Sequence, residues 1–326
     1  MRRISILLLI LFAGFSCNKA GQQSAAQSDS PVSVPSFNAD SAYQYTVDQV
    51  AFGPRVPNTE AHKQGGNYLA EQLKRFGAQV TEQETTLYLQ DNTPIQIKNI
   101  IGAFMPEKKQ RIMLFAHWDT RPYADHDPDP ENWRKPIDGA NDGAGSCAVL
   151  LEIARQISTN EPKLGIDIIF FDAEDWGPPS FTDNTKHYGS WCMGSEYWSK
   201  HPHVPNYTAR YGILLDMVSA PNATFYKEAF SVEYASPVIK KVWETAQKLG
   251  YGNYFINEDM GAIEDDHVHV IANRKFPCID IIQYDPSSDT GFGDYWHTMN
   301  DNISNVSKET MKASGQTVLE VIYNEK

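Results

Sequence analysis

Residues 165–176 read Gly-Ile-Asp-Ile-Ile-Phe-Phe-Asp-Ala-Glu-Asp-Trp, an apolar run that ends in three carboxylates within four residues. The apolar part is typical of a strand that is buried on both faces. Like charges crowded at the end of such a strand repel each other, and a bound cation or a partly protonated carboxylate relieves that repulsion. Taken alone, Asp172, Glu174 and Asp175 are equally compatible with a solvated acidic turn.

Four further fragments favour the cation. Each places a side chain that can bind a metal at the end of an apolar strand or in the loop after one. The fragments are His117-Trp118-Asp119, Asn141-Asp142-Gly143, Leu215-Asp216 and Trp296-His297-Thr298. Because a catalytic zinc site takes three protein ligands from His and carboxylate groups, the five fragments together predict a zinc site.

Apolar strands alternate with amphipathic helices along the chain, which predicts a single α/β domain whose mixed, largely parallel central sheet has helices on both faces. The turn at residues 106–109 is interpreted as a hairpin between its flanking strands. Ligands of such sheets bind beyond the carboxyl ends of the strands, where His117, Glu174, Asp175 and Asp216 fall. We expect strands over 80–89, 95–104, 111–116, 166–171, 211–215 and 278–283, and helices over 61–76, 146–156, 238–249 and 307–322.

The amino-terminal residues 1–17 are similar to a bacterial lipoprotein signal peptide. Arg2 and Arg3 precede an apolar stretch over 4–15 that is too short to span a bilayer, and Ser16-Cys17 closes it. Residues 18–37 lack an apolar period, so we expect a disordered tether ahead of a catalytic domain over 38–326. These features predict an exported protein that a lipid on Cys17 anchors to a bacterial membrane, facing the periplasm. An ordinary signal peptide cleaved elsewhere is the alternative.

The composition limits the classes of partner. A hydrophobic content of 41% allows a large core, and the formal net charge of -13 argues against nucleic acid, which requires basic patches. An acidic protein suits a substrate that carries a positive amine. Beyond Cys17 the chain has Cys147, Cys192 and Cys278, so at most one disulfide can form among them.

Asp142, Asp175 and His297 would supply three zinc ligands from three distant loops and leave a fourth coordination position open. Asp142 lies among small residues, 139–145, that let the backbone approach an ion closely. The alternative for Asp142 alone is a residue that starts the following helix. The prediction of a zinc site therefore rests on the three residues together and on their order in the chain.

Residues beside the ligands are expected to support them. Thr298 and the pair Asn300-Asp301 could hold the tautomer of the neighbouring imidazole of His297. Glu174, next to Asp175, is placed to move protons beside the metal. The alternative for Glu174 is an ordinary surface glutamate.

As a series, these motifs resemble those of zinc-dependent aminopeptidases and, most closely in order and spacing, those of the animal-type glutaminyl cyclases. The resemblance covers nearly everything from about Ser41 to the carboxyl terminus. It implies one zinc per chain, bound by Asp142, Asp175 and His297, with Glu174 as the general acid/base. Cyclases usually have Glu at the second ligand position, so Asp175 is a shorter ligand that zinc accepts. The motifs are Ala116-His117-Trp118-Asp119, Gly139 to Asp142, Phe171 to Asp175, Leu215-Asp216 and Trp296-His297-Thr298.

The resemblance also implies roles for the residues around the metal. Asp265, in Glu264-Asp265-Asp266-His267, would relay protons with Asp216 and Glu174. Cys147 matches a disulfide position of animal cyclases, but Ala116 stands at the partner position, so that bridge is absent. The implied pocket walls are Trp191, Phe292 and Trp296, and the residues that would bind a second metal or support the first are His117 and Asp119.

From this resemblance we expect an acyltransferase, a zinc-dependent glutaminyl-peptide cyclotransferase that converts N-terminal Gln of peptides and proteins to pyroglutamate and releases ammonia. The alternative enzyme is a dizinc aminopeptidase on the same scaffold. There, a second zinc bound through His117 and Asp216, with Asp142 bridging, would activate a water molecule. A third possibility is a lipoprotein that keeps the fold only to bind peptides, although Glu174 and the three ligands are all present.

Overall fold

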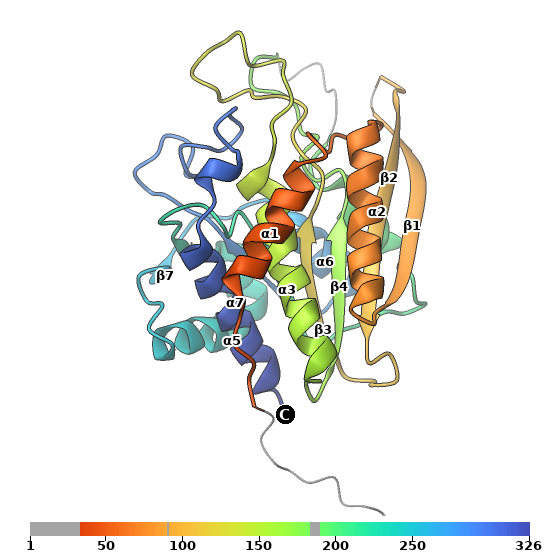
Figure 1. Ribbon diagram of the computed structural model, residues 1–326, viewed down its shortest axis with the longest axis vertical. Helices are drawn as coiled ribbons and strands as arrows, with labels where there is room; N and C mark the ends of the chain where they lie inside the picture. Colours follow the sequence, from red (N-terminus) through yellow and green to blue (C-terminus); the bar gives the residue numbers. More distant parts are fainter. Residues whose placement is uncertain (1–32, 90, 183–189) are drawn as a thin grey trace, which may run out of the picture. The chain divides into compact units, whose positions relative to one another are not determined.

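The computed structural model describes residues 33–326, apart from residue 90 and residues 183–189. The predicted signal peptide, Cys17 and most of the predicted tether lie outside these residues. A six-stranded sheet with the order β1-β2-β4-β3-β5-β8 runs through the described chain (Figure 1). Its strands are β1 (Gln79–Tyr88), β2 (Pro94–Phe104), β3 (Arg111–His117), β4 (Gly165–Phe171), β5 (Gly212–Asp216) and β8 (Cys278–Ile282).

The sheet is mixed and largely parallel, as predicted. Strand β3 pairs in parallel with β4 and β5, and β5 pairs in parallel with β8, whereas β2 is antiparallel to both β1 and β4. The predicted hairpin between β2 and β3 is wrong, because β4 lies between these two strands. The hairpin is formed instead by β1 and β2, whose turn is closed by the Leu89 N–H donating to the Thr93 carbonyl at 2.9 Å.

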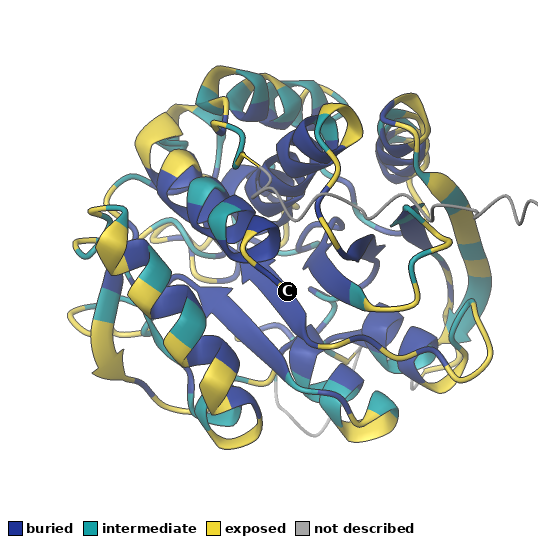
Figure 2. Cartoon of the chain, turned by 90° about the horizontal axis from the view of Figure 1, so that it is seen from below, coloured by how far each residue is buried: buried dark blue, intermediate teal, exposed yellow. Residues whose placement is uncertain are grey.

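Helices cover both faces of the sheet, which confirms the expected layers (Figures 1 and 2). Figure 2 shows the buried strands between the helices, whose outward faces carry the exposed residues. One face is covered by α1 (Ala39–Val50), α2 (Glu60–Arg75), α3 (Ser146–Thr159), α5 (Ala229–Lys248) and α7 (Lys308–Tyr323), and the other by α4 (Met193–Lys200) and α6 (Asp266–Arg274).

Alternation along β3 places its side chains in two different parts of the core. Ile112 and Leu114 pack in the larger cluster with residues of α2, α3, α5 and α7. Met113 and Phe115 point to the opposite face and pack with Trp198 of α4. All four strand residues are fully buried, and burying a side chain of this size contributes roughly 1.5–3 kcal/mol. Both faces of the strand are therefore fixed, and so is the position at which it ends.

Several elements were not predicted. These are α1, α4, α6 and a small parallel sheet of β6 (Phe225–Lys227) and β7 (Phe255–Asp259). Helix α5 begins well before residue 238, because it continues through a kink at Ala235, two residues ahead of Pro237. A proline normally marks the first turn of a helix. Pro237 therefore led to a predicted helix start at residue 238, too late in the chain.

The residues just ahead of α1 pack on the domain. Phe37 is only 3% exposed, the Gln156 amide donates to the Ser36 carbonyl at 3.0 Å, and the Asn160 amide donates to the Ser33 carbonyl. The packed chain therefore begins before the predicted boundary at residue 38. Among the described residues, no helix combines the length and the apolar character that crossing a membrane requires.

Candidate metal centre and active site

The predicted ligands come together at the carboxyl edge of the sheet. His117 is the last residue of β3 and Asp216 the last residue of β5, and these strands are parallel neighbours. Asp142 belongs to a tight turn, η1 (Ala140–Gly145), directly ahead of α3. His297 follows β8 in the chain, and the acidic segment follows β4. The parallel order of the strands thus explains why distant fragments meet.

Local backbone structure sets the direction of Asp142. The next residue, Gly143, has φ +100°, and a Cβ atom there would lie 2.8 Å from the Asp119 carbonyl oxygen. Glycine is therefore required at this position. The Asp301 carboxylate accepts hydrogen bonds from the N–H groups of Asn141 (2.7 Å) and Asp142 (3.0 Å). These contacts fix the turn that presents the Asp142 carboxylate.

Asp142, Asp175 and His297 form one buried group. His297 Nε2 lies 3.2 Å from Asp175 Oδ1 and 3.6 Å from Asp142 Oδ2. One ligand atom from each residue lies within 4.8 Å of the other two. The structure thus brings together the three residues that the sequence predicts as zinc ligands.

The donor atoms of this group fit a zinc ion. Asp175 is only 1% exposed, yet neither of its carboxylate oxygens accepts a hydrogen bond from a described residue. His297 Nε2 at 3.2 Å and the Arg121 guanidinium at 3.6 Å lie near Oδ1 without hydrogen-bond geometry. A buried carboxylate without hydrogen bonds is unfavourable, and a divalent cation would use its free lone pairs. Two carboxylates and one imidazole are donors that zinc accepts.

A second group shares Asp142. His117 Nε2 lies 2.9 Å from Asp142 Oδ1 and 3.3 Å from Asp216 Oδ1. All three residues are buried, and their ligand atoms also lie within 4.8 Å of one another. This group has the composition that a second metal would need, so the geometry by itself is compatible with one or with two metal ions.

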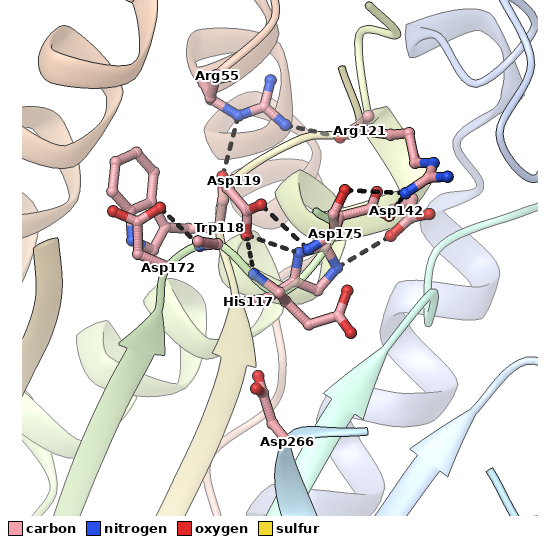
Figure 3. Close-up of polar contacts among 12 residues, drawn as sticks. Arg55, His117, Trp118, Asp119, Arg121, Asp142, Asp172, Asp175 and Asp266 are labelled. Carbon is pink, nitrogen blue, oxygen red and sulfur yellow. Dashed lines mark hydrogen bonds and ion pairs between the residues drawn. The ribbon is translucent and has the colours of Figure 1, made fainter. Parts of the chain in front are cut away.

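Asp119 orients the acidic segment. Its carboxylate accepts the N–H groups of Glu174 (3.0 Å) and Asp175 (3.2 Å), and it lies 3.5 Å from His117 Nδ1 (Figure 3). The segment turns sharply at Ala173, which has φ +51°. Asp119 therefore supports both metal-ligand groups, and its carboxylate points to backbone and imidazole nitrogens.

Asp125, which sequence reasoning missed, faces the other nitrogen of His297. Its Oδ1 lies 3.5 Å from His297 Nδ1. The guanidinium of Arg121 donates to both oxygens of Asp125, at 3.0 and 2.8 Å, and to the Asp175 carbonyl at 3.2 Å. Metal-binding histidines are commonly oriented in this way by a carboxylate. The sequence did carry a signal for Asp125. Arg121 and Asp125 are four residues apart, and they follow closely on a strand that ends in the candidate ligand His117.

The predicted support of His297 by Thr298 and Asn300-Asp301 is wrong. The Thr298 hydroxyl donates to the Tyr295 carbonyl, and Asp301 binds the turn of Asp142 instead. Residues that follow His297 in the chain continue into the turn beyond it, so they do not reach its Nδ1 atom. Thr298 and Asp301 therefore stabilise the surrounding loops.

Glu174 lies at a cavity of about 290 Å³ at this edge of the sheet. Burial raises the pKa of its carboxyl well above the ordinary value, and the nearby Asp265 and Asp175 raise it further. Burial, and then the nearby Asp216, raise the pKa of Asp265 to about 7. The cavity thus places carboxyl groups that can hold a proton near neutral pH beside the candidate zinc ligands.

The predicted aromatic walls line the same cavity. The Trp296 ring is stacked on the His297 imidazole, with 3.8 Å between the ring centroids, and the Phe292 ring lies 4.7 Å from Trp296. Trp191 lies nearly parallel to the same imidazole at 6.1 Å. These rings enclose a small space suited to a flat, uncharged group.

The remaining buried polar residues near the site hold its loops. Arg55 is completely buried and donates to the carbonyls of Trp118, Asp138 and Gly139, which ties the loop after β3 to the turn of Asp142 (Figure 3). Cysteines 147, 192 and 278 are all free and buried. The absence of the cyclase-type disulfide thus agrees with the expectation from Ala116.

Comparison with known proteins places this geometry in a family. Residues 99–322 match the model of peptidase family M28. Among curated proteins, the chain is similar to the glutaminyl-peptide cyclotransferase of Bos taurus, with 28% identity over 290 residues that cover 79% of this chain and 74% of the relative.

Two crystal structures are close in both sequence and fold. One is a Zn-dependent exopeptidase from Parabacteroides distasonis, 60% identical with a TM-score of 0.88, and the other a glutaminyl cyclase from Tannerella forsythia, 59% identical with a TM-score of 0.87. Each match covers 90% of this chain and 100% of the other. The similarity therefore extends over the full length of both solved chains.

Proposed function

The chain belongs to peptidase family M28, and we propose that within this family it is a zinc-dependent glutaminyl-peptide cyclotransferase. It converts the N-terminal Gln of peptides or proteins to pyroglutamate and releases ammonia. The observation that carries this proposal is the buried group of Asp142, Asp175 and His297 with Glu174 beside it, at a small cavity with aromatic walls. The similarity to glutaminyl cyclases over the whole domain supports the same reaction.

The reaction is an intramolecular acyl transfer. The α-amine nitrogen of the substrate forms a bond to the carbon of its own γ-amide, and the bond from that carbon to the amide nitrogen breaks. Both reacting groups belong to one residue, so holding its side chain in a folded conformation supplies much of the acceleration. Trp296, Phe292 and Trp191 provide the walls that favour this compact conformation.

Glu174 carries the proton between the two nitrogens. It accepts a proton from the attacking α-amine and donates it to the departing amide nitrogen, which leaves as ammonia. The raised pKa of Glu174 suits a group that must both accept and donate near neutral pH. Asp265 and Asp216 line the same cavity, and the pKa of about 7 lets Asp265 hold a proton beside Glu174 near neutral pH. Asp142, Asp175 and His297 would hold the zinc ion, which would supply Lewis-acid polarisation of the γ-amide carbonyl.

We propose one zinc per chain. His297, Asp142 and Asp175 line the cavity that receives the substrate, whereas His117 is not among the described residues that line it. The alternative, a dizinc aminopeptidase, is favoured by the group of His117, Asp142 and Asp216. Peptide hydrolysis would need a second metal there and an activated water molecule.

Metal analysis combined with two substrates tests the proposal. One zinc ion per chain and release of ammonia from a peptide with N-terminal Gln are expected. Glu174→Gln should retain zinc and lose about 10²- to 10⁴-fold in turnover, whereas Glu161→Gln, at a surface glutamate, should behave as the wild type. Two zinc ions together with cleavage of a leucine anilide would overturn the cyclase function, and turnover by Glu174→Gln would remove Glu174 from its role.

We also propose that the protein is exported and attached to a bacterial membrane, facing the periplasm, by a lipid on Cys17. The support is the sequence of residues 1–17, with two arginines, an apolar stretch and a small residue ahead of the cysteine. Labelled fatty acid should be incorporated into the wild-type protein and not into Cys17→Ser. Incorporation that persists in this variant would contradict the anchor.

A further inference from the structure

The carboxylate of Glu174 has an unusual hydrogen-bond donor. Cys192 Sγ lies 3.2 Å from Glu174 Oε1, and within the described part of the chain this thiol is the one side chain that donates to Glu174. The other close groups include Asp175 and Asp265. Carboxylates repel one another when ionised and do not fix the direction of a neighbour.

Backbone pairing holds Cys192 against the Glu174 segment. The Cys192 N–H donates to the Glu174 carbonyl at 2.9 Å, and the Met193 N–H donates to the Ala173 carbonyl at 3.0 Å. Asp175 and Trp191 form an antiparallel bridge beside them. This pairing fixes the position of Cys192, the residue before α4, relative to the acidic segment. It also directs the Cys192 thiol toward Glu174.

Both paired segments contain a residue in the left-handed region. Ala173 has φ +51° and Cys192 has φ +56°. Such conformations cost free energy for residues other than glycine and persist where the surrounding structure enforces them. The Ser195 hydroxyl adds a hydrogen bond to the Cys192 carbonyl at 3.1 Å. The position of the thiol is therefore fixed by several independent contacts.

The thiol is present as a donor under ordinary conditions. An unperturbed cysteine has a pKa near 8.5 and is protonated at neutral pH. Cys192 is fully buried, and burial raises its pKa further. Its S–H group can therefore donate to Glu174 throughout the working range of most enzymes.

We propose that Cys192 is a positioning residue, whose thiol holds the Glu174 carboxylate in the orientation from which it exchanges protons with the substrate. This inference rests on the proposed cyclase function for its kinetic consequence. The contact with Glu174 itself does not depend on the identity of the substrate.

Substitution of the thiol tests the proposal kinetically. In Cys192→Ala, kcat should fall about tenfold with KM unchanged, because the weak S–H donor is lost while the walls of the cavity remain. Cys192→Ser retains a donor and should recover kcat to within about threefold of the wild type. Wild-type kcat in Cys192→Ala overturns the proposal, as does an equal loss in both variants.

A matched control separates this role from packing. Cys278 is also a fully buried free cysteine, but its Sγ contacts only the Phe276 carbonyl, at 3.8 Å, among the described hydrogen-bond partners. Cys278→Ala should lower the melting temperature and leave kcat unchanged. A similar loss of kcat in Cys278→Ala would show that burial, rather than the contact with Glu174, explains the effect of Cys192→Ala.

A spectroscopic measurement tests the contact without turnover. The S–H stretching band of Cys192 is identified by its absence in Cys192→Ser, and it should shift to higher frequency in Glu174→Ala because the acceptor is removed. An unchanged band overturns the proposal. The band reports the contact even if the wild-type enzyme does not cyclise Gln, so failure of the inference and failure of the proposed function are distinguishable.

Discussion

His297 and His117 lie on opposite sides of the Asp142 carboxylate, and each faces one of its oxygens through Nε2. On the His117 side the ring makes a 2.9 Å hydrogen bond to Asp142 and lies 3.3 Å from Asp216. On the His297 side the distance to Asp142 is 3.6 Å, and both oxygens of Asp175 lack donors in the described chain. The His117 side also has one carboxylate oxygen without a described donor, Asp216 Oδ1, but the His297 side has two, so it offers a cation more free lone pairs.

The two sides also differ in access. His297 lines the cavity together with Glu174 and the aromatic walls, whereas His117 is not among the described residues that line it. The same fold therefore provides two similar sets of metal-binding groups, but only the His297 set has all three of its members in the wall of the cavity. The difference suggests that free donor atoms and access, more than the presence of ligand-type residues, decide where the catalytic zinc binds.

The largest effect that separates the two sides is expected from removing each imidazole. His297→Ala should lose the zinc and about a thousandfold in turnover, since zinc contributes several kcal/mol of charge stabilisation in such reactions. His117→Ala should retain one zinc per chain and lose about tenfold or less, because it removes a hydrogen bond to Asp142. Metal analysis and kcat measure both, with His201→Ala on the surface as the control. If His117→Ala lost its metal while His297→Ala retained it, the zinc would be assigned to the His117 side.

A smaller effect is expected from the carboxylates that face the two Nδ1 atoms. Asp125→Asn should weaken zinc binding about 10- to 100-fold, as is typical for residues that orient a ligand. Asp119→Asn should change zinc affinity less and lower the melting temperature, because Asp119 accepts two backbone N–H groups. Competition with a chelator measures the affinity. Equal losses of affinity in the two variants would show that the sides are equivalent.

The smallest effect on catalysis is expected at a third His–carboxylate pair, His267 and Glu228, which does not line the cavity. Burial alone would raise the pKa of Glu228, but hydrogen bonds from His267 and from the N–H groups of Phe230 and Ser231 outweigh it and lower the pKa to about 2. A lowered pKa stabilises the fold above the unfolded value near 4.5, and this stabilisation is lost as the pH falls through about 2.

Glu228→Gln should therefore reduce the free energy of unfolding at neutral pH by up to about 3 kcal/mol. It should also flatten the loss of stability between about pH 5 and pH 2, while zinc content stays at the wild-type level. Urea unfolding at several pH values measures this. An unchanged pH profile would contradict the lowered pKa of Glu228.

Much of the sheet and the proposed ligand set could be predicted because strand ends carry a strong sequence signal. Apolar runs such as β4 mark buried strands, and parallel neighbours bring His117, Asp216 and the acidic segment to one edge. The pairing of β2 could not be predicted, since its pattern fits an antiparallel partner on either side. Only the position of β4 between β2 and β3 decides it.

The supporting residues could not be found from the sequence because their partners are distant in the chain. Arg55 binds the carbonyls of Asp138 and Gly139, and Cys192 reaches Glu174 across a segment with no regular period. Asp125 faces His297 although 172 positions separate them in the numbering. Contacts to backbone carbonyls and thiols leave no periodic pattern, so only the folded chain reveals them.

Helix α3 separates the first described residue, Ser33, from the active site. It starts at Ser146, directly after the turn of Asp142, and ends beside Asn160, whose amide holds Ser33. Its 14 residues span about 21 Å at 1.5 Å per residue. Ser33 thus lies at the end of the helix remote from the turn of Asp142. No residue of the described segment 33–37 lines the cavity, so even a bulky folded protein could present its amino terminus there.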